Sequence, residues 1–316
     1  MTATRTPNHR RDANPRPPAA AAITGSDHGT LAGWIRRHPI TAFAVWFFTV
    51  GWAFVFIPAV ARSAWGLDLP MQPFIVASTL FGLLLPALVI TRMVDGPDGV
   101  RRLLRSALHW RAALSWYVVA LLAVPVTAMA IAVVMFGPPD APLSTVATVV
   151  VGGLLVQTAI GVVTNNLWEE VAWMGFVQAR LQVRHGALMA AVLTTPLFTL
   201  QHLPLFLDAG AFAVVILGLA MLIMFPNRVL LGWVHDRTGS LLLVGLLHAS
   251  GNAVANGSGW GSGVLARLYP GQEVGMLHLI AGVALGLAVI AATRLRHRKA
   301  APRRRQSVSS GNAVSP

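Results

Sequence analysis

The sequence predicts an all-α protein, a polytopic bundle of about eight transmembrane helices with both termini in the cytoplasm. Hydrophobic residues make up 55% of the 316-residue chain and charged residues only 11%, and the mean hydropathy is +0.64. An average soluble domain carries about 25% charged residues, so this chain cannot cover a water-facing surface of its size. Long uncharged runs and a regular alternation of arginine-rich and arginine-poor connections support the same fold class.

Eight apolar segments carry this prediction. The shorter segments lie near the lower limit of about 17 residues for a helix that crosses a bilayer core. In chain order the segments cover residues 40–60, 74–91, 114–136, 146–178, 187–206, 211–231, 240–256 and 274–293.

The connections between these segments sort by charge. Three of them hold eight arginines in total: 92–111, 179–186 and 232–239. The four alternate connections hold two arginines in total: 61–73, 137–145, 207–210 and 257–273. Because arginine resists translocation, eight spans with the arginine-rich connections and both basic tails inside satisfy the positive-inside rule. We therefore expect a multi-pass protein of the plasma membrane.

Two basic tails flank the spans. Residues 1–38 carry six arginines and no apolar periodicity. Within the C-terminal tail of 294–316, residues 294–305 hold seven basic residues and no acid. Both are expected to be disordered. Juxtamembrane charge that faces anionic lipid explains them better than nucleic-acid binding, so the lipid bilayer is a predicted partner and nucleic acid is not. The absence of cysteine excludes disulfides, thiolate zinc sites and cysteine nucleophiles.

Titratable side chains inside a span cost about 2.5–3.5 kcal/mol each and mark functional sites. Glu169 and Glu170 lie together in the fourth segment, His202 in the fifth, and His248 with Asn252 in the seventh. The second, third and sixth segments are interpreted as having no ionisable residue in their middles, and His278 of the eighth segment is interpreted as structural. The polar residues are therefore concentrated on segments four, five and seven.

These residues are expected at similar depths. At 1.5 Å per helical residue, Glu170 and His248 lie roughly 15 Å from the cytoplasmic ends of their helices, and a kink at Pro196 shortens the nominal 24 Å of His202. The two glutamates project about 100° apart on a helix, so one should face the reaction and the other should support it.

A carboxylate, two imidazoles and a carboxamide suffice for peptide hydrolysis. The carboxylate takes a proton from water beside one histidine, and the second histidine and the carboxamide donate hydrogen bonds to the oxyanion. The alternative is a zinc ion held by Glu169, His202 and His248. The HExxH motif is absent, and the spacing alone does not choose between the two interpretations.

Three motifs in this order resemble the CPBP family of intramembrane proteases, which includes the type II CaaX prenyl proteases. The family's E-E-x-x-x-R-G corresponds to residues 169–175, F-x-x-x-H to Phe198 and His202, and H-x-x-x-N to His248 and Asn252. The resemblance covers a catalytic core of residues 145–256. Residues 39–144 would then form the N-terminal transmembrane helices, and 257–293 an external loop and the last helix.

The resemblance implies a role for each residue. Glu169 would be the general base, His202 its partner in activating water, and His248 with Asn252 the oxyanion donors. Glu170, with Phe198 and Asn166, would support them. The family has been described as metalloproteases, but the resemblance favours a metal-free glutamate mechanism without a cofactor. The substrate would be a membrane-embedded or lipidated peptide or protein.

One position departs from the family motif. Met174 stands where the motif has an arginine that could pair with Glu170 at i,i+4. We therefore expect Glu170 to be protonated or hydrogen-bonded to a polar neighbour such as Asn166. The departure keeps a catalytically silent membrane scaffold open as an alternative, and buried Glu and His keep a proton-coupled transporter open. The sequence indicates no oligomeric state.

Overall fold

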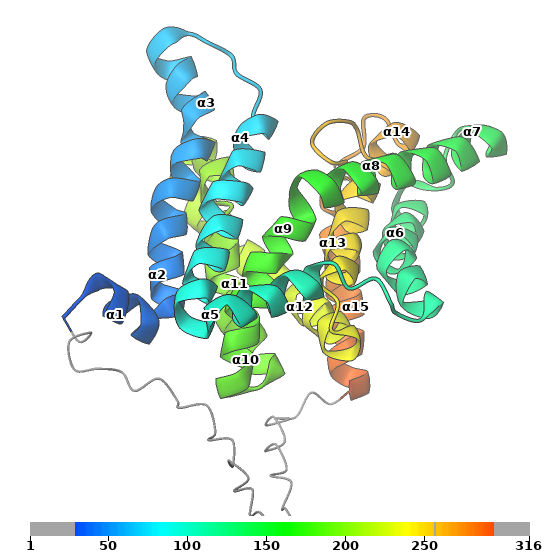
Figure 1. Ribbon diagram of the computed structural model, residues 1–316. Coiled ribbons are helices and arrows are strands. Elements are labelled where there is room, and N and C mark those ends of the chain that lie inside the picture. Colours follow the sequence, from blue (N-terminus) through cyan, green and yellow to red (C-terminus); the bar gives the residue numbers. More distant parts are fainter. Residues whose placement is uncertain (1–28, 256, 294–316) are drawn as a thin grey trace, which may run out of the picture.

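The computed structural model describes residues 29–255 and 257–293, and within them every regular element is helical (Figure 1). Five helical units are long and apolar enough to cross a membrane, and three shorter apolar helices accompany them. The long units run Pro39–Trp65, Gln72–Ala107, Leu114–Phe136, Leu143–His185 and Ala209–Thr238, and the short helices run Ala187–Leu200, Leu241–Ala255 and Leu277–Thr293.

These eight units follow the eight predicted segments in order, which confirms the all-helical membrane class. The count of eight spans and the orientation of the termini stay predictions, because three of the helices have only 14 to 17 residues. The first two units contain α2 (Pro39–Trp46), α3 (Trp52–Trp65), α4 (Gln72–Ala77) and α5 (Leu85–Ala107). The later units contain α6 (Leu114–Phe136), α11 (Ala187–Leu200), α12 (Ala213–Thr238), α13 (Leu241–Ala255) and α15 (Leu277–Thr293).

The N-terminal boundary of the bundle differs from the prediction. Leu31–Arg37 forms the short helix α1, so the expectation of a disordered tail up to residue 38 is wrong for this stretch. The Thr30 side chain caps α1 by accepting a hydrogen bond from the Gly33 amide at 3.1 Å, and Ile35 packs against the buried cluster around Phe43. The predicted disorder of the remaining N-terminal residues and of 294–316 lies outside the described residues.

The fourth unit bends rather than crossing the bundle as one rod. It consists of α7 (Leu143–Thr148), α8 (Leu154–Gly161), α9 (Leu167–Glu170) and α10 (Ala179–His185), joined by π-helical turns. In Figure 1, α7 and α8 lie across one end of the bundle, and α9 and α10 descend toward the other end. Both glutamates lie on α9, between two π-helical segments, and such insertions occur often at functional sites.

α5 also bends. Gly96 has a left-handed φ of 69°, and Pro97 follows it. The second half of α5 therefore runs across the arginine-rich end of the bundle instead of continuing along it (Figure 1).

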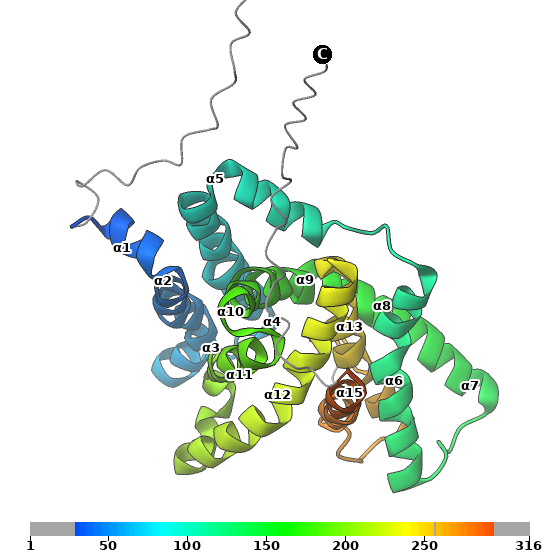
Figure 2. The same ribbon diagram turned by 90° about the horizontal axis from the view of Figure 1, so that it is seen from below.

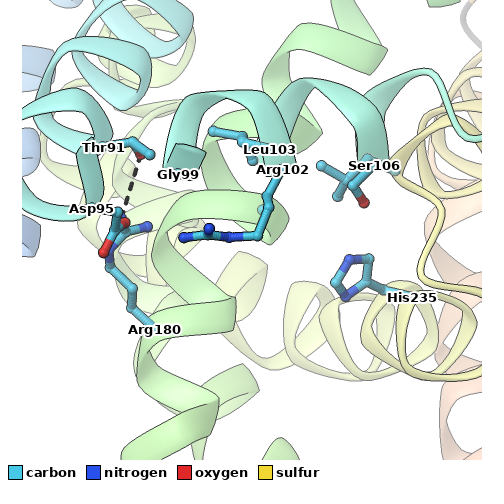
Figure 3. A pocket seen from close by; sticks show the side chains of 10 residues that line it. Thr91, Asp95, Gly99, Arg102, Leu103, Ser106, Arg180 and His235 are labelled. Carbon is cyan, nitrogen blue, oxygen red and sulfur yellow. Dashed lines mark hydrogen bonds and ion pairs between the residues drawn. The ribbon is translucent and has the colours of Figure 1, made fainter. Parts of the chain in front are cut away.

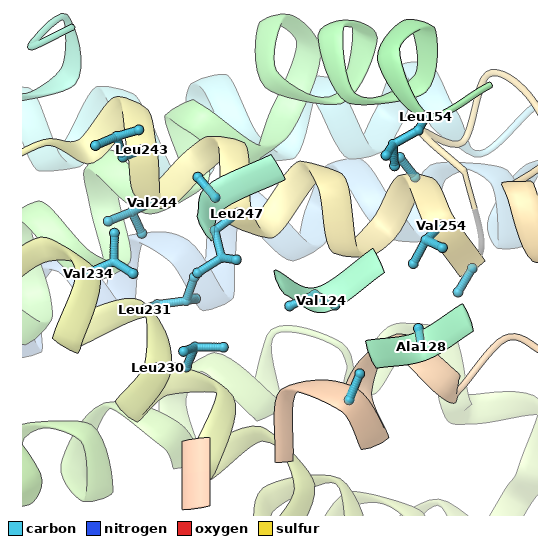
Figure 4. Close-up of a cluster of buried hydrophobic side chains, with 14 of the residues drawn as sticks. Val124, Ala128, Leu154, Leu230, Leu231, Val234, Leu243, Val244, Leu247 and Val254 are labelled. Atoms are coloured by element: carbon cyan, nitrogen blue, oxygen red, sulfur yellow. The ribbon is translucent and has the colours of Figure 1, made fainter. Parts of the chain in front are cut away.

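α13 lies at the centre of the bundle, where it contacts α6, α8, α9, α12 and α15 (Figure 2). Its apolar face joins one large buried cluster that includes Val124, Leu230 and Leu247 (Figure 4). On another face the backbone of α9 approaches closely. A Cβ atom built at Gly245 would lie 2.9 Å from the Leu167 Cα. The missing side chain at Gly245 thus lets α9 carry its glutamates to within reach of α13.

Adding a side chain at Gly245 should separate α9 from α13. We expect Gly245→Val to lower the free energy of unfolding by about 1–3 kcal/mol, the usual range for overpacking, because the nearest obstacle is backbone that cannot rotate away. Thermal unfolding in detergent measures the change. Gly218→Ala on α12 is the matched control, since a Cβ there meets nothing within 4 Å. Equal unfolding temperatures for the two variants would contradict the close approach.

Candidate active site

One cavity of about 430 Å³ brings the four residues with expected catalytic roles together. Its walls come from helices that are far apart in the sequence, as expected from the depths of the motif residues. The motif and supporting residues among its lining are Asn166, Glu169, Phe198, His202, His248 and Asn252. Glu170 does not line this cavity. The expectation that the two glutamates face different directions is therefore confirmed.

Glu169 faces the cavity and is held by a chain of hydrogen bonds. Its side chain is almost fully buried, and its Oε1 atom accepts a hydrogen bond from the Gln201 Nε2 at 2.5 Å. The Oε1 atom of Gln201 accepts in turn from the indole Nε1 of Trp173 at 2.5 Å. This arrangement fixes one carboxylate oxygen and leaves the second oxygen available to the cavity.

The orientation of His202 follows from its backbone contact. Its Nδ1 atom lies 3.0 Å from the Phe198 carbonyl oxygen, which can only accept, so Nδ1 carries the hydrogen. In the neutral imidazole Nε2 is then free to accept a proton. Among the described residues no hydrogen bond joins Glu169 directly to His202, although both line the cavity. A water molecule between them could contact both groups.

Glu170 lies at the centre of a buried ionic cluster. The Nη1 atom of Arg228 on α12 lies 2.9 Å from both carboxylate oxygens, and neither side chain is exposed at all. The same carboxylate accepts from the Nδ1 of His248 at 2.9 Å. Gln178 completes the cluster by accepting from the Nε and Nη2 atoms of Arg228 at 3.2 and 3.1 Å. Four side chains from three helical units are therefore joined around one carboxylate.

Arg228 bears on two expectations. The sixth segment does contain a deeply placed ionisable residue, because α12 continues to Thr238 and not to the predicted end at 231. Ten residues separate Arg228 from that helix end, which is roughly 15 Å. Glu170 is hydrogen-bonded to polar neighbours, as one of the two expected arrangements required, but the neighbours are Arg228 and His248 and not Asn166. Among the described residues the Asn166 Nδ2 atom has no hydrogen-bond partner.

Phe198 explains why the F-x-x-x-H motif needs an aromatic residue. Its ring lies edge-on to His202, with 5.2 Å between the ring centroids, and tilted against His248 at 6.4 Å. The Arg228 guanidinium carbon lies 5.0 Å from the centroid of the same ring, in cation–π geometry. Phe198 thus contacts Arg228 of the ionic cluster and both histidines that line the cavity.

Besides Arg228, which does not line the cavity, sequence reasoning missed two residues that do. Gln201 precedes His202, and a polar residue next to a motif histidine inside an apolar segment was the available signal. His278, interpreted as structural, lines the same cavity. It comes from α15, outside the resembling core, and no motif marks it.

The residues proposed as alternative zinc ligands are not arranged as a metal centre. In the described ranges 29–255 and 257–293, no group of three His, Asp or Glu side chains is placed to hold a metal ion. The Nδ1 atoms of His202 and His248 donate to oxygen atoms of the protein, which leaves both Nε2 atoms free. The zinc alternative therefore stays a prediction.

Comparison with known proteins agrees with the motifs. Residues 151–254 match the family described as type II CAAX prenyl endopeptidase Rce1-like. No curated protein and no solved structure matches the chain. The match begins in the π-helical turn after α7 and ends in α13, so it contains both glutamates, both motif histidines, Asn252 and Arg228. The resemblance to the CaaX-protease family is thus confirmed over this span.

Arg228→Met should destabilise the bundle by about 3–5 kcal/mol, because it leaves the buried Glu170 carboxylate without its cation. Adding Met174→Arg should recover most of this loss, since residue 174 is also fully buried and lies one helical turn after Glu170. Thermal unfolding of the three proteins in detergent measures both effects. Arg184→Met, on the exposed part of α10, is the control for loss of a positive charge. An unfolding temperature for Arg228→Met equal to that of the control would show that the ion pair is not needed.

Proposed function

Because residues 151–254 match the type II CAAX prenyl endopeptidase Rce1-like family, we propose that this integral membrane protein is an intramembrane endopeptidase. A Glu/His-activated water would attack a peptide bond of a membrane-associated substrate. The observation that carries the proposal is the single cavity lined by Glu169, His202, His248 and Asn252. Membrane proteins seldom place this set of groups in one interior site without a function.

Glu169 and His202 would generate the nucleophile. The carboxylate oxygen of Glu169 that Gln201 does not hold accepts a proton from water, and the Nε2 of His202 accepts a hydrogen bond from the same water and fixes its position. The water oxygen forms a bond to the carbonyl carbon of the substrate, and the π electron pair moves onto the carbonyl oxygen. The proton on Glu169 then passes to the departing amine as the C–N bond breaks. The products are a carboxylic acid and an amine, and the enzyme forms no covalent intermediate.

His248 and Asn252 would stabilise the oxyanion. The Nδ1 hydrogen of His248 points to Glu170, so the ring donates through Nε2 only in its doubly protonated form. The carboxylate at 2.9 Å stabilises that imidazolium and fixes the plane of its ring. The Asn252 carboxamide supplies the second donor from one turn further along α13. Glu170 and Arg228 are therefore positioning residues, which act on the reaction through His248.

The Glu170–Arg228 pair weighs against the silent scaffold. That alternative depends on Met174, which removes the arginine of the motif. Arg228 supplies a guanidinium to the same carboxylate from a different helix, so the ionic contact is present although its position in the sequence has changed. A scaffold has no need to maintain this contact in a fully buried position, where desolvation is costly.

Glu169→Gln should abolish peptide cleavage and leave the fold intact. Loss of a general base lowers the rate by about 10²- to 10⁴-fold, and the amide keeps the size of the side chain. The measurement compares new peptide N-termini in membranes of cells that express the wild type or the variant. Glu273→Gln, on the exposed connection before α15, is the matched control. Identical sets of N-termini from the wild type and Glu169→Gln would contradict the proposed hydrolysis.

Chelators should leave the activity unchanged, because the mechanism assigns every step to side chains of the protein. The measurement is the cleavage rate of the purified protein in liposomes before and after phenanthroline or EDTA, then with added zinc. Rate loss on chelation that stoichiometric zinc restores would instead make Glu169, His202 and His248 metal ligands.

A further inference from the structure

The cavity that contains Glu169 is closed toward one end of the bundle. Between α9 and α10 the π-helical segment Val171–Gln178 fills the interior of the bundle. Four of its side chains are completely buried: Trp173, Met174, Phe176 and Val177. The Glu170–Arg228 pair lies in the same layer. A water molecule or a peptide would have to displace these side chains to reach Glu169 from this end.

A second cavity, of about 250 Å³, lies on the far side of this layer. Gly175 of the first motif lines it, but none of the residues with expected catalytic roles does. Arg102 on the second half of α5 extends there toward Arg180 of α10, with Asp95 beside it (Figure 3). Arg180 also pairs with Asp95 and stacks on the Phe176 ring, 4.0 Å from its centroid. This cavity belongs to the arginine-rich end and does not lead to the catalytic residues.

The catalytic cavity opens toward the opposite end. Its exposed lining residues, Leu205, Gly259 and Met276, lie in or next to connections that contain few arginines. The Gln72 Nε2 donates to the Ser258 carbonyl oxygen at 3.1 Å, so the start of α4 and the connection after α13 meet at the mouth of the cavity. The polar groups of the site lie at the inner end of this opening.

The two ends differ strongly in charge. The three connections at the closed end hold eight arginines and three aspartates, whereas the four connections at the open end hold two arginines and four acidic residues. Arginine-rich connections stay in the cytoplasm. The cavity opens at the end with few arginines, and the arginine-rich end faces the cytoplasm. These two facts together determine which side of the membrane supplies the substrate.

We propose that the substrate enters from the extracytoplasmic side, an inference that rests on the proposed endopeptidase function. Its class is a membrane-anchored polypeptide whose scissile bond lies at or outside the outer half of the bilayer. The mouth is lined by apolar side chains, among them Val55, Ile75, Phe206 and Met276, and these fit an apolar segment next to that bond. A lipidated peptide presented at the cytoplasmic surface meets the closed end and is not a substrate.

The first part of the test uses the absence of cysteine from the chain. Met276→Cys places a thiol at the mouth, where the side chain is 50% exposed, and Val183→Cys places one on α10, where it is 76% exposed. With a membrane-impermeant maleimide on intact cells, Met276→Cys should be labelled and Val183→Cys should be labelled only after permeabilisation. The reverse pattern would overturn the proposal, and neither result depends on catalytic activity.

The second part maps the cleavage sites. Peptide N-termini that appear in membranes with the wild type and not with Glu169→Gln should lie on extracytoplasmic segments of their parent proteins. Sites in cytoplasmic tails would overturn the proposal even if proteolysis itself is real. If no N-termini distinguish the two proteins, the proposed endopeptidase function fails and the substrate side falls with it, whereas the labelling result still reports the orientation of the mouth.

Discussion

The buried pair of Glu170 and Arg228 is the interaction on which the rest of the site depends. A lone carboxylate or guanidinium in the interior of an apolar bundle is strongly unfavourable, and the cost falls only when both charges are paired and hydrogen-bonded. Here Arg228 contacts both oxygens of Glu170, Gln178 accepts from the other guanidinium nitrogens, and His248 donates to the Oε1 atom of Glu170. The pair therefore joins α9, α12 and α13 at one point.

The backbone geometry makes this cluster possible. Gly245 lets α9 contact α13 through backbone atoms, and π-helical turns before and after α9 redirect the chain so that adjacent glutamates serve different surroundings. Glu169 faces a cavity where water and a peptide can enter, while Glu170 faces the ionic cluster. Phe198 lies between the two environments and contacts Arg228 and both histidines. Glu169 is thus available for the reaction, while the neighbouring Glu170 stabilises the bundle.

Much of this arrangement could be predicted from the sequence, and the reasons for the failures are physical. Apolar run length located the helices, and the motif order placed Glu169, His202, His248 and Asn252 in one cavity. Arg228 was missed because the predicted end of the sixth segment at 231 put this arginine near a helix end, whereas α12 continues to Thr238 and places it deeper in the bundle. Pairing between helices also has no sequence period, so Met174 suggested a lost contact that α12 in fact supplies. The direction in which the cavity opens depends on packing alone.

The most direct test of the account is a double-mutant cycle on the central pair. Glu170→Gln, Arg228→Met and the double variant are unfolded thermally in detergent beside the wild type. Because each single change leaves a buried group without its partner, we expect the double variant to be no less stable than Arg228→Met. The coupling energy between the two substitutions should lie within about 0.5–3 kcal/mol, the range for residues in direct contact. Additive losses from the two changes would show that Arg228 does not act through Glu170.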